Sequence, residues 1–567
     1  MLQSKNRNLS EFICNHYIWW AFVLVILITL FNIGCFLQES GSLFYTDSDC
    51  YTRALRIIDW LKDFQWAEKL FPYFNPPYGF ELHFTRICDV IWLALATPFM
   101  LFLPLKEAVF YGGMVFSPLF MALALAVVLW GLKPYLPKMK NQHITFIIFS
   151  LTALCLFDKL SDIFNFSRPD HHSLMCFIVC CALAMILRNQ IRQKPKSLFW
   201  LGVLCGCGLW ASSALEGLFV VAIVLSVLAV NRIFYRHSAL ELLYYAIGLF
   251  LCVMFAWIIN PPLNGWLAVD INRLSIVHVV LTALMVSAFW ALTWFRDENR
   301  LWQICYFGIA AMVCALLMLL IFGSERLFVS VYNPEVYKVF IQEIDEMQHQ
   351  TFWDYATPSF VFGALIMGYL IYISRGRQAY VVQLLIFFAV ITTAALIYRR
   401  FYQYYIAIFV VLYGIGLFLL MFAAAKSEKG KLGALLYVLF PVFYLNAFYP
   451  APQKTEFPPL KANALVYIFK APELMFYQGV DTVGGPYHTN VEGIVDNRLI
   501  WTSEDEEEVK NLLKKHQVRS IYLSDCKNCE AEKHTHQLFG QVISGQNLYP
   551  WLNKIGDGHY EIDYTKF

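Results

Sequence analysis

The apolar segment IWLALATPFMLFLPL, residues 91–105, decides how this chain is threaded through a membrane. Apolar runs recur between Trp19 and Tyr449, and most are about 17 to 25 residues long, enough for a helix to cross a bilayer. The runs are continuous rather than alternating, which predicts a bundle of helices and not a barrel. Whether residues 91–105 also cross the bilayer fixes the side on which every later loop lies.

The composition agrees with a membrane protein. Of the 567 residues, 59% are hydrophobic and 15% are charged, whereas a soluble domain averages about 25% charged residues. The formal net charge is only +2, so nothing indicates a nucleic-acid partner. Most of the 15 cysteines lie inside the apolar runs, where a thiol packs as a small hydrophobic group.

Apart from residues 91–105, the apolar runs predict about thirteen membrane-spanning helices. If residues 91–105 do not cross, the lysines and arginines of the loops gather on the side of the N-terminus. The positive-inside rule makes that side cytoplasmic, and a crossing at 91–105 would break the segregation. We therefore expect a re-entrant or interfacial helix there. The predicted spans are 17–37, 108–131, 143–158, 174–187, 198–213, 215–231, 239–258, 276–295, 302–322, 359–374, 379–397, 404–424 and 432–449.

This threading divides the chain into a transmembrane domain, residues 1–449, and an external C-terminal domain, residues 450–567. It also creates two large external loops, at residues 38–107 and 324–358. We expect a multi-pass protein of the bacterial inner membrane, with its N-terminus in the cytoplasm and its C-terminal domain in the periplasm.

The C-terminal domain is predicted to be small and mixed α/β. An amphipathic helix at Asp505–His516 precedes a strand-like segment at Val518–Leu523. Cys526 and Cys529 form a CxxC pair with two histidines nearby. A disulfide, free thiols and a zinc site all remain open for this pair, and an oxidising compartment favours the disulfide.

Three external segments place acidic or imidazole side chains at helix boundaries. Carboxylates and imidazoles from separate loops can converge on one divalent cation, and such a set suits Mn²⁺ or Mg²⁺. Solvated loop charges would give the same pattern, so both interpretations remain open from the residues alone. The candidates are Asp47 and Asp49 in DSD, Asp170, His171 and His172 in SRPDHHS, and Glu343, Asp345 and Glu346 in EIDEMQ.

Other polar groups are secondary candidates. Glu81, His83 and Arg86 lie in FNPPYGFELHFTRICD, and such groups are costly beside a membrane unless they face water or a site. Glu216 lies in a tight external turn and is a weaker candidate of the same kind. Arg400, in YRRFYQYY, could bind phosphate oxygens or could anchor a helix at the headgroups.

Together these motifs resemble those of the GT-C glycosyltransferases, specifically the catalytic subunit of oligosaccharyltransferase and its bacterial and archaeal homologues. In this resemblance Asp49 of DSDCYTR takes the place of the family's metal-binding aspartate. PDHHS stands where the family has D-x-D, so Asp170 matches the first acid and His172 replaces the second. EIDEMQHQT resembles the SVSEHQPT form of the third motif and puts Glu346 on its glutamate. Arg400 matches the arginine that holds the donor pyrophosphate.

The sequence departs from that family in its C-terminal domain. The WWDYG motif, which reads the acceptor sequon, is absent, and GGPYHTNVEGIVD, residues 484–496, stands roughly in its place. His488 in this segment is a further candidate. The chain also resembles a group of bacterial membrane proteins with PP-G-x-x-x-H-x-x-R, DHH and PYH-x-N segments. Protein N-glycosylation is therefore not the expected activity.

The resemblance implies a periplasmic glycosyltransferase that takes a sugar or oligosaccharide from a polyprenyl-phosphate or polyprenyl-pyrophosphate donor. The acceptor would be an unidentified glycan, lipid or protein of the envelope. Metal ligands would be Asp49, Asp170, His172 and Glu346, of which Asp49, Asp170 and Glu346 are the catalytic candidates. Two alternatives are a transporter or flippase for a lipid-linked or polar substrate, and a non-catalytic envelope-assembly protein. A transporter predicts charged groups along a central path, whereas the candidates here gather on one face.

Overall fold

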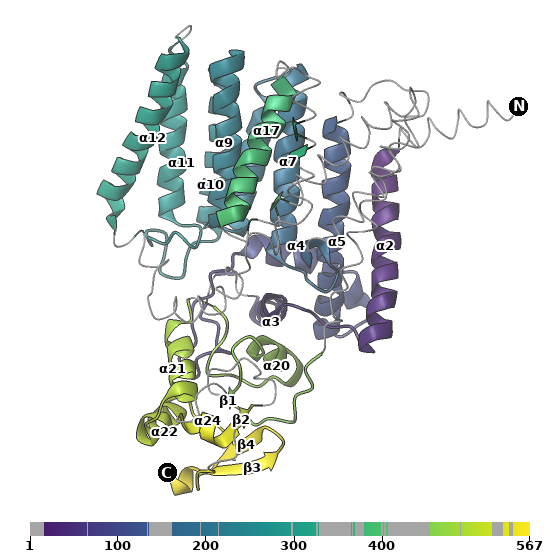
Figure 1. Cartoon of the computed structure of the whole chain (residues 1–567), viewed down its shortest axis with the longest axis vertical. Helices are drawn as coiled ribbons and strands as arrows, with labels where there is room; N and C mark the ends of the chain where they lie inside the picture. The colour runs from purple at the N-terminus through teal and green to yellow at the C-terminus, as the bar shows by residue number, and fades with distance from the viewer. Residues whose placement is uncertain are drawn as a thin grey trace, which may run out of the picture.

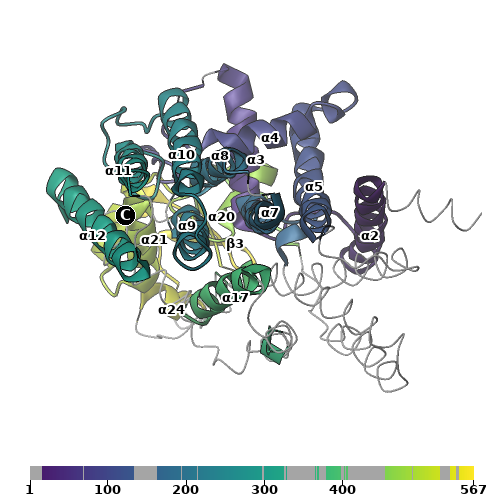
Figure 2. The same cartoon turned by 90° about the horizontal axis from the view of Figure 1, so that it is seen from above.

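A computed structural model of the chain places a bundle of long helices above a smaller domain that carries the C-terminus (Figure 1). Seen from above, α2 (Tyr17–Ser40) and α12 (Arg300–Phe322) lie at opposite edges of the bundle (Figure 2). The structure describes residues 16–64, 66–67, 69–132, 134, 162–192, 194–213, 215–295, 299–324, 327, 364–365, 367–368, 379–397, 401, 404–405, 454–487, 489–523, 537–543 and 548–567.

Within those ranges, six helices are long and apolar enough to cross a membrane. The helical membrane protein expected from the sequence is confirmed. The total number of spans is not confirmed, because four predicted spans lie wholly or mostly outside the described residues: 143–158, 359–374, 404–424 and 432–449. The six are α2 (Tyr17–Ser40), α5 (Leu105–Leu132), α7 (His171–Arg192), α9 (Leu215–Tyr235), α10 (Ala239–Ile259) and α12 (Arg300–Phe322), and α8 (Ser197–Ala211), α11 (Ile276–Leu292) and α17 (Ala379–Ile397) are shorter apolar helices.

Small residues set the closest helix contact in the bundle. A Cβ atom on Gly202 of α8 would lie 2.0 Å from the carbonyl oxygen of Tyr245 on α10, and one on Gly248 of α10 would lie 2.0 Å from that of Phe199 on α8. Only glycine permits this approach, and close packing of small residues is a main source of helix association in membranes. The two helices therefore form a rigid pair within the bundle.

The segment between α2 and α5 lies across the foot of the bundle (Figures 1 and 2). It contains α3 (Ser48–Asp63), α4 (Arg86–Ala96) and the 3₁₀ helix η1 (Phe99–Leu101). Residues 91–105 are thus divided among the end of α4, η1 and the start of α5. With 11 residues, α4 is shorter than the about 20 residues that a span needs. α3 has no counterpart among the helices predicted from the sequence.

The C-terminal domain contains a four-stranded sheet in the order β1-β2-β4-β3. β1 pairs parallel to β2, and the other pairings are antiparallel. As the sequence predicted, helix α22 (Glu506–Lys515) is capped by Asp505 and is followed by β2 (Ser520–Tyr522). The remaining elements are β1 (Ala464–Leu465), β3 (Leu552–Gly556), β4 (His559–Ile562), α20 (Ala471–Gln478), α21 (Val491–Thr502), α24 (Leu538–Ile543) and the 3₁₀ helix η4 (Tyr564–Lys566).

The C-terminal domain is joined to the first loop by backbone hydrogen bonds. The Asn75 amide donates to the Thr482 carbonyl at 3.1 Å, and the Thr482 amide donates to the Tyr73 carbonyl at 3.0 Å. The imidazole Nδ1 of His516 also lies 2.9 Å from the Pro76 carbonyl. Buried side chains of α20 belong to the same hydrophobic core as the bundle. The first loop and the C-terminal domain therefore form one packed layer beneath the helices.

Candidate metal centre

The DSD and DHH segments, about 120 residues apart in the sequence, meet at the foot of the bundle. The Thr46 amide donates to the Ser167 carbonyl at 3.0 Å, and their hydroxyl oxygens are 3.2 Å apart. Nε of Arg168 lies 2.8 Å from Oδ2 of Asp47. These contacts bring the N-terminus of α3 against the N-terminus of α7.

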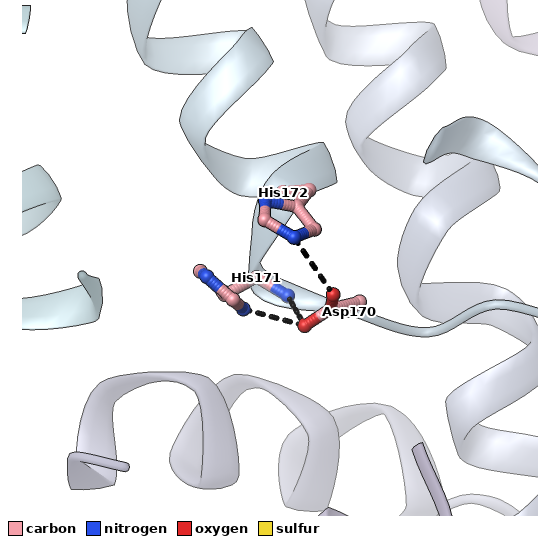
Figure 3. Close-up of side chains that lie close together, drawn as sticks. All are labelled: Asp170, His171 and His172. Carbon is pink, nitrogen blue, oxygen red and sulfur yellow. Dashed lines mark hydrogen bonds and ion pairs between the residues drawn. The ribbon is translucent and has the colours of Figure 1, made fainter. Parts of the chain in front are cut away.

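Asp170, His171 and His172 form a buried group at the start of α7 (Figure 3). One potential ligand atom from each lies within 4.8 Å of the others. Oδ1 of Asp170 is 2.5 Å from Nδ1 of His171, and its Oδ2 is 3.3 Å from Nε2 of His172. The same carboxylate accepts the His171 backbone amide at 2.6 Å. A helix N-terminus favours a carboxylate there.

Glu216, at the start of α9, closes the group from the other side. Its Oε2 lies 3.5 Å from Nε2 of His171 and 3.3 Å from Nδ1 of His172. The carboxylate is itself held by the Tyr404 hydroxyl, which donates to Oε2 at 2.8 Å. Each imidazole thus faces Asp170 with one nitrogen and Glu216 with the other. A second carboxylate that fixes the tautomer and ring orientation of histidine is a common feature of metal sites.

Arg53 of α3 is buried against the same group. Its Nη2 lies 3.1 Å from Nδ1 of His171 and its Nε lies 3.6 Å from Oδ1 of Asp170, while its guanidinium stacks 3.8 Å from the centroid of the Phe84 ring. Burial alone would raise the pKa of Asp170, but His171, His172 and Arg53 hold that pKa well below its usual range. Asp170 is therefore an ionised ligand candidate at neutral pH.

Asp49 lies in the first turn of α3, where Asp47 accepts the Asp49 amide and caps the helix. The residue as a whole is half-buried. Burial of its carboxylate raises the pKa of Asp49, and the charges of Asp47 and Asp170 raise that pKa further, while Arg53 opposes them. Asp49 is thus electrostatically coupled to Asp170, although it stands outside the tight Asp170–His171–His172 group.

The donor set fits a divalent cation. Nδ1 of His171 and Oδ1 of Asp170 face one another at 2.5 Å. Either a proton on Nδ1 or a cation bound by both atoms would join them, and a bound cation would take the place of that proton. Carboxylate oxygen and neutral imidazole nitrogen are both ordinary metal ligands.

The secondary candidates of the first loop have other partners. Nη1 of Arg273 lies 2.5 Å from Oε1 of Glu81, and Arg86 pairs with Asp89 at 3.4 Å. His83 packs against Phe84, with 4.7 Å between ring centroids. The ion pairs of Glu81 and Arg86 satisfy these two charges without a ligand. Several predicted residues lie outside the described residues: Glu343, Asp345 and Glu346 of the EIDEMQ segment, Arg400, His488, and Cys526 and Cys529 of the CxxC pair.

Two residues of the centre were missed in the sequence. Arg53 follows Asp49 by four positions, and on a helix that spacing places both on one face, so recognising α3 would have identified it. Tyr487 of the C-terminal domain donates a hydrogen bond to Thr52, three residues after Asp49, at 2.6 Å, and no local pattern marks it. Glu216, ranked as a weaker candidate, in fact contacts both imidazoles.

Comparisons with known proteins show which known fold this chain shares. Scans against protein-family models and against curated protein sequences both give no match. Among solved structures, the chain is similar to the oligosaccharyltransferase AglB of Archaeoglobus fulgidus in complex with an inhibitory peptide and a dolichol-phosphate. The TM-score is 0.64 and the identity 14%, over 90% of this chain and 69% of the archaeal one.

Two further structures of the archaeal protein agree. The form tethered to an acceptor peptide with the NVT sequon gives a TM-score of 0.63 at 14% identity, over 98% of this chain and 74% of that one. The complex with Zn and sulfate gives 0.58 at 14% identity, over 88% and 67%. The expected resemblance is therefore confirmed at the level of the fold, and this chain has the fold of an archaeal oligosaccharyltransferase.

Proposed function

We propose that this protein is a membrane glycosyltransferase that transfers a sugar or oligosaccharide from a polyprenyl-phosphate or polyprenyl-pyrophosphate donor to an acceptor in the cell envelope. The observation that carries the proposal is the buried group of Asp170, His171, His172 and Glu216 beside Asp49. It lies where the loops of an oligosaccharyltransferase-like fold meet the C-terminal domain.

The residues fit a metal-assisted transfer. A divalent cation bound here would neutralise the negative charge that develops on the departing phosphate. Asp170, His171 and His172 would hold it, with Asp49 and Glu346 as further ligands from other loops. Two imidazoles in the set favour Mn²⁺ or a softer ion over Mg²⁺, which narrows the expectation from the sequence.

The surrounding residues have separate tasks. Glu216 would accept the outer N–H of each imidazole and so fix both rings, and Arg53 would keep Asp170 ionised. Asp49, which keeps part of its surface exposed, could also orient or deprotonate an acceptor hydroxyl or amide. Arg400 remains our proposed ligand for the donor phosphate.

The proposed sidedness follows from charge. The ends of the helices away from the centre carry Arg192, Arg232, Arg236 and Arg300, and the positive-inside rule would place that end in the cytoplasm. The centre and the C-terminal domain would then face the periplasm of a bacterial inner membrane. The archaeal neighbour was solved with a dolichol-phosphate, which supports a lipid phosphate as the donor class here.

Metal removal tests the proposal directly. The detergent-purified protein is incubated with Mn²⁺ and a panel of polyprenyl-phosphate and polyprenyl-pyrophosphate sugars, with water as the acceptor of the sugar, and the freed lipid phosphate and free sugar are measured by mass spectrometry. We expect release from at least one donor, its loss on addition of EDTA, and its recovery when Mn²⁺ is restored. Release that EDTA leaves unchanged would contradict the metal-assisted mechanism, and no release from any donor would contradict the donor class.

A further inference from the structure

One carboxylate oxygen of Glu216 is the meeting point of three parts of the chain. Oε2 lies 3.5 Å from Nε2 of His171 and 3.3 Å from Nδ1 of His172, both at the start of α7. The same oxygen accepts a hydrogen bond from the Tyr404 hydroxyl at 2.8 Å. Glu216 is 2% exposed and Tyr404 is 0% exposed. The direction in which this carboxylate points is therefore set by buried protein groups.

Tyr404 comes from a segment 188 positions after Glu216, and packing holds its ring in place. The ring centroid lies 6.5 Å from that of Phe219, which follows Glu216 by three positions on α9 and so shares its face of the helix. Phe401 packs on the same Phe219 ring, with 4.3 Å between centroids. The Tyr404 hydroxyl is thus a donor in a fixed position.

A fixed donor matters because the terminal torsion of a glutamate side chain is soft. The Tyr404 hydroxyl restricts that torsion and keeps Oε2 of Glu216 against the outer nitrogen of each imidazole. An outer carboxylate of this kind sets the tautomer and the orientation of a metal-binding histidine. With the proton of each ring on the side of Glu216, the nitrogen that faces Asp170 is left to bind a cation.

We infer that Tyr404 is a positioning residue for Glu216, and that through Glu216 it directs both imidazoles toward the cation. The inference rests on the proposed function, because it takes His171 and His172 to be metal ligands. It also gives the YRRFYQYY segment a second task. Arg400, the proposed ligand of the donor phosphate, precedes Tyr404 by four positions, so one segment would serve both the donor and the metal centre.

A purely structural role for Tyr404 is the competing explanation, and three variants separate the two. Tyr404→Phe keeps the ring and its contact with Phe219 and removes only the hydroxyl. Tyr405→Phe is the matched control, because Tyr405 is equally buried and its ring packs against Phe388 of α17, with 5.9 Å between centroids. Glu216→Met removes the oxygen through which Tyr404 would act and keeps much of the side-chain volume.

Mn²⁺ affinity of the full-length protein is measured by electron paramagnetic resonance, and thermal unfolding is followed in parallel. Loss of the outer partner of a metal-binding histidine lowers metal affinity by about 10- to 100-fold, which we expect for Glu216→Met. We expect a loss near the lower end of that range, about tenfold, for Tyr404→Phe and an affinity close to wild type for Tyr405→Phe. Residues that act through one another are not additive, so the double variant that combines Glu216→Met with Tyr404→Phe should bind no more weakly than Glu216→Met alone.

Each other outcome is decisive. Wild-type affinity in Tyr404→Phe or in Glu216→Met would overturn the inference and leave the proposed function standing. Equal losses in Tyr404→Phe and Tyr405→Phe would also overturn it, because they would reflect a loosened segment, and so would additive losses in the double variant. The comparison of the two tyrosine variants decides the inference even if Glu216→Met does not fold. Absence of Mn²⁺ binding in the wild-type protein would contradict the proposed metal-assisted function, and the inference would fall with it.

Discussion

Asp170→Asn is expected to lower the rate of sugar transfer by at least two orders of magnitude, the usual cost of losing one charge-stabilising contact at such a site. Asp170 contacts both imidazoles and Arg53, so the substitution removes a ligand charge while it preserves side-chain volume. The measurement is the initial rate of lipid phosphate release, at a Mn²⁺ concentration that saturates the wild-type protein.

Asp59→Asn is the control for this substitution. Asp59 is also on α3, but its carboxylate pairs with Lys69 at 2.8 Å and with the Tyr73 hydroxyl at 3.0 Å, away from the histidines. We expect Asp59→Asn to transfer at nearly the wild-type rate and Asp49→Asn to resemble Asp170→Asn. Near-normal rates in both Asp49→Asn and Asp170→Asn would exclude these two carboxylates from catalysis.

Arg53→Met is expected to destabilise the protein by about 3 to 5 kcal/mol, because removing one partner of a buried ion pair leaves the other charge uncompensated. The side chains of Arg53 and Asp170 are each only 2% exposed. Methionine keeps much of the packing against Phe84 but provides no charge. The measurement is the shift in an unfolding titration in mixed detergent.

Arg168→Met provides the matched comparison. Arg168 approaches Asp47 more closely, at 2.8 Å, but these two side chains are 27% and 21% exposed. Solvent screens such a pair, and we expect a loss below about 1 kcal/mol. If Arg168→Met destabilised the protein as much as Arg53→Met or more, burial would not govern these ion pairs, and the role given to Arg53 would be wrong.

The features visible in the sequence are those that depend on local pattern. Long apolar runs predicted the helices, and the DHH segment at the start of α7 predicted a group that the structure brings together in Asp170, His171 and His172. α22 could be predicted as well, because its acidic first turn and basic last turn match the helix dipole.

The remainder depends on contacts between distant segments. α3 is not strongly apolar, and its first half is buried only because it lies between the bundle and α20. Tyr487 and Thr52 are separated by 435 positions, so no periodicity or spacing could pair them. In the sequence, Glu216 could be recognised only as an acidic residue in a tight external turn. Its contact with both imidazoles depends on how α7 and α9 pack.

The central claim is that loops distant in the sequence share one divalent cation. Mn²⁺ binding by electron paramagnetic resonance, in wild type, Asp49→Asn, Asp170→Asn and the control Asp59→Asn, tests it most directly. We predict saturable binding in the wild type and in Asp59→Asn, and its loss in the other two. Absence of binding in the wild type, or binding unaffected by Asp49→Asn and Asp170→Asn, would contradict a shared cation site.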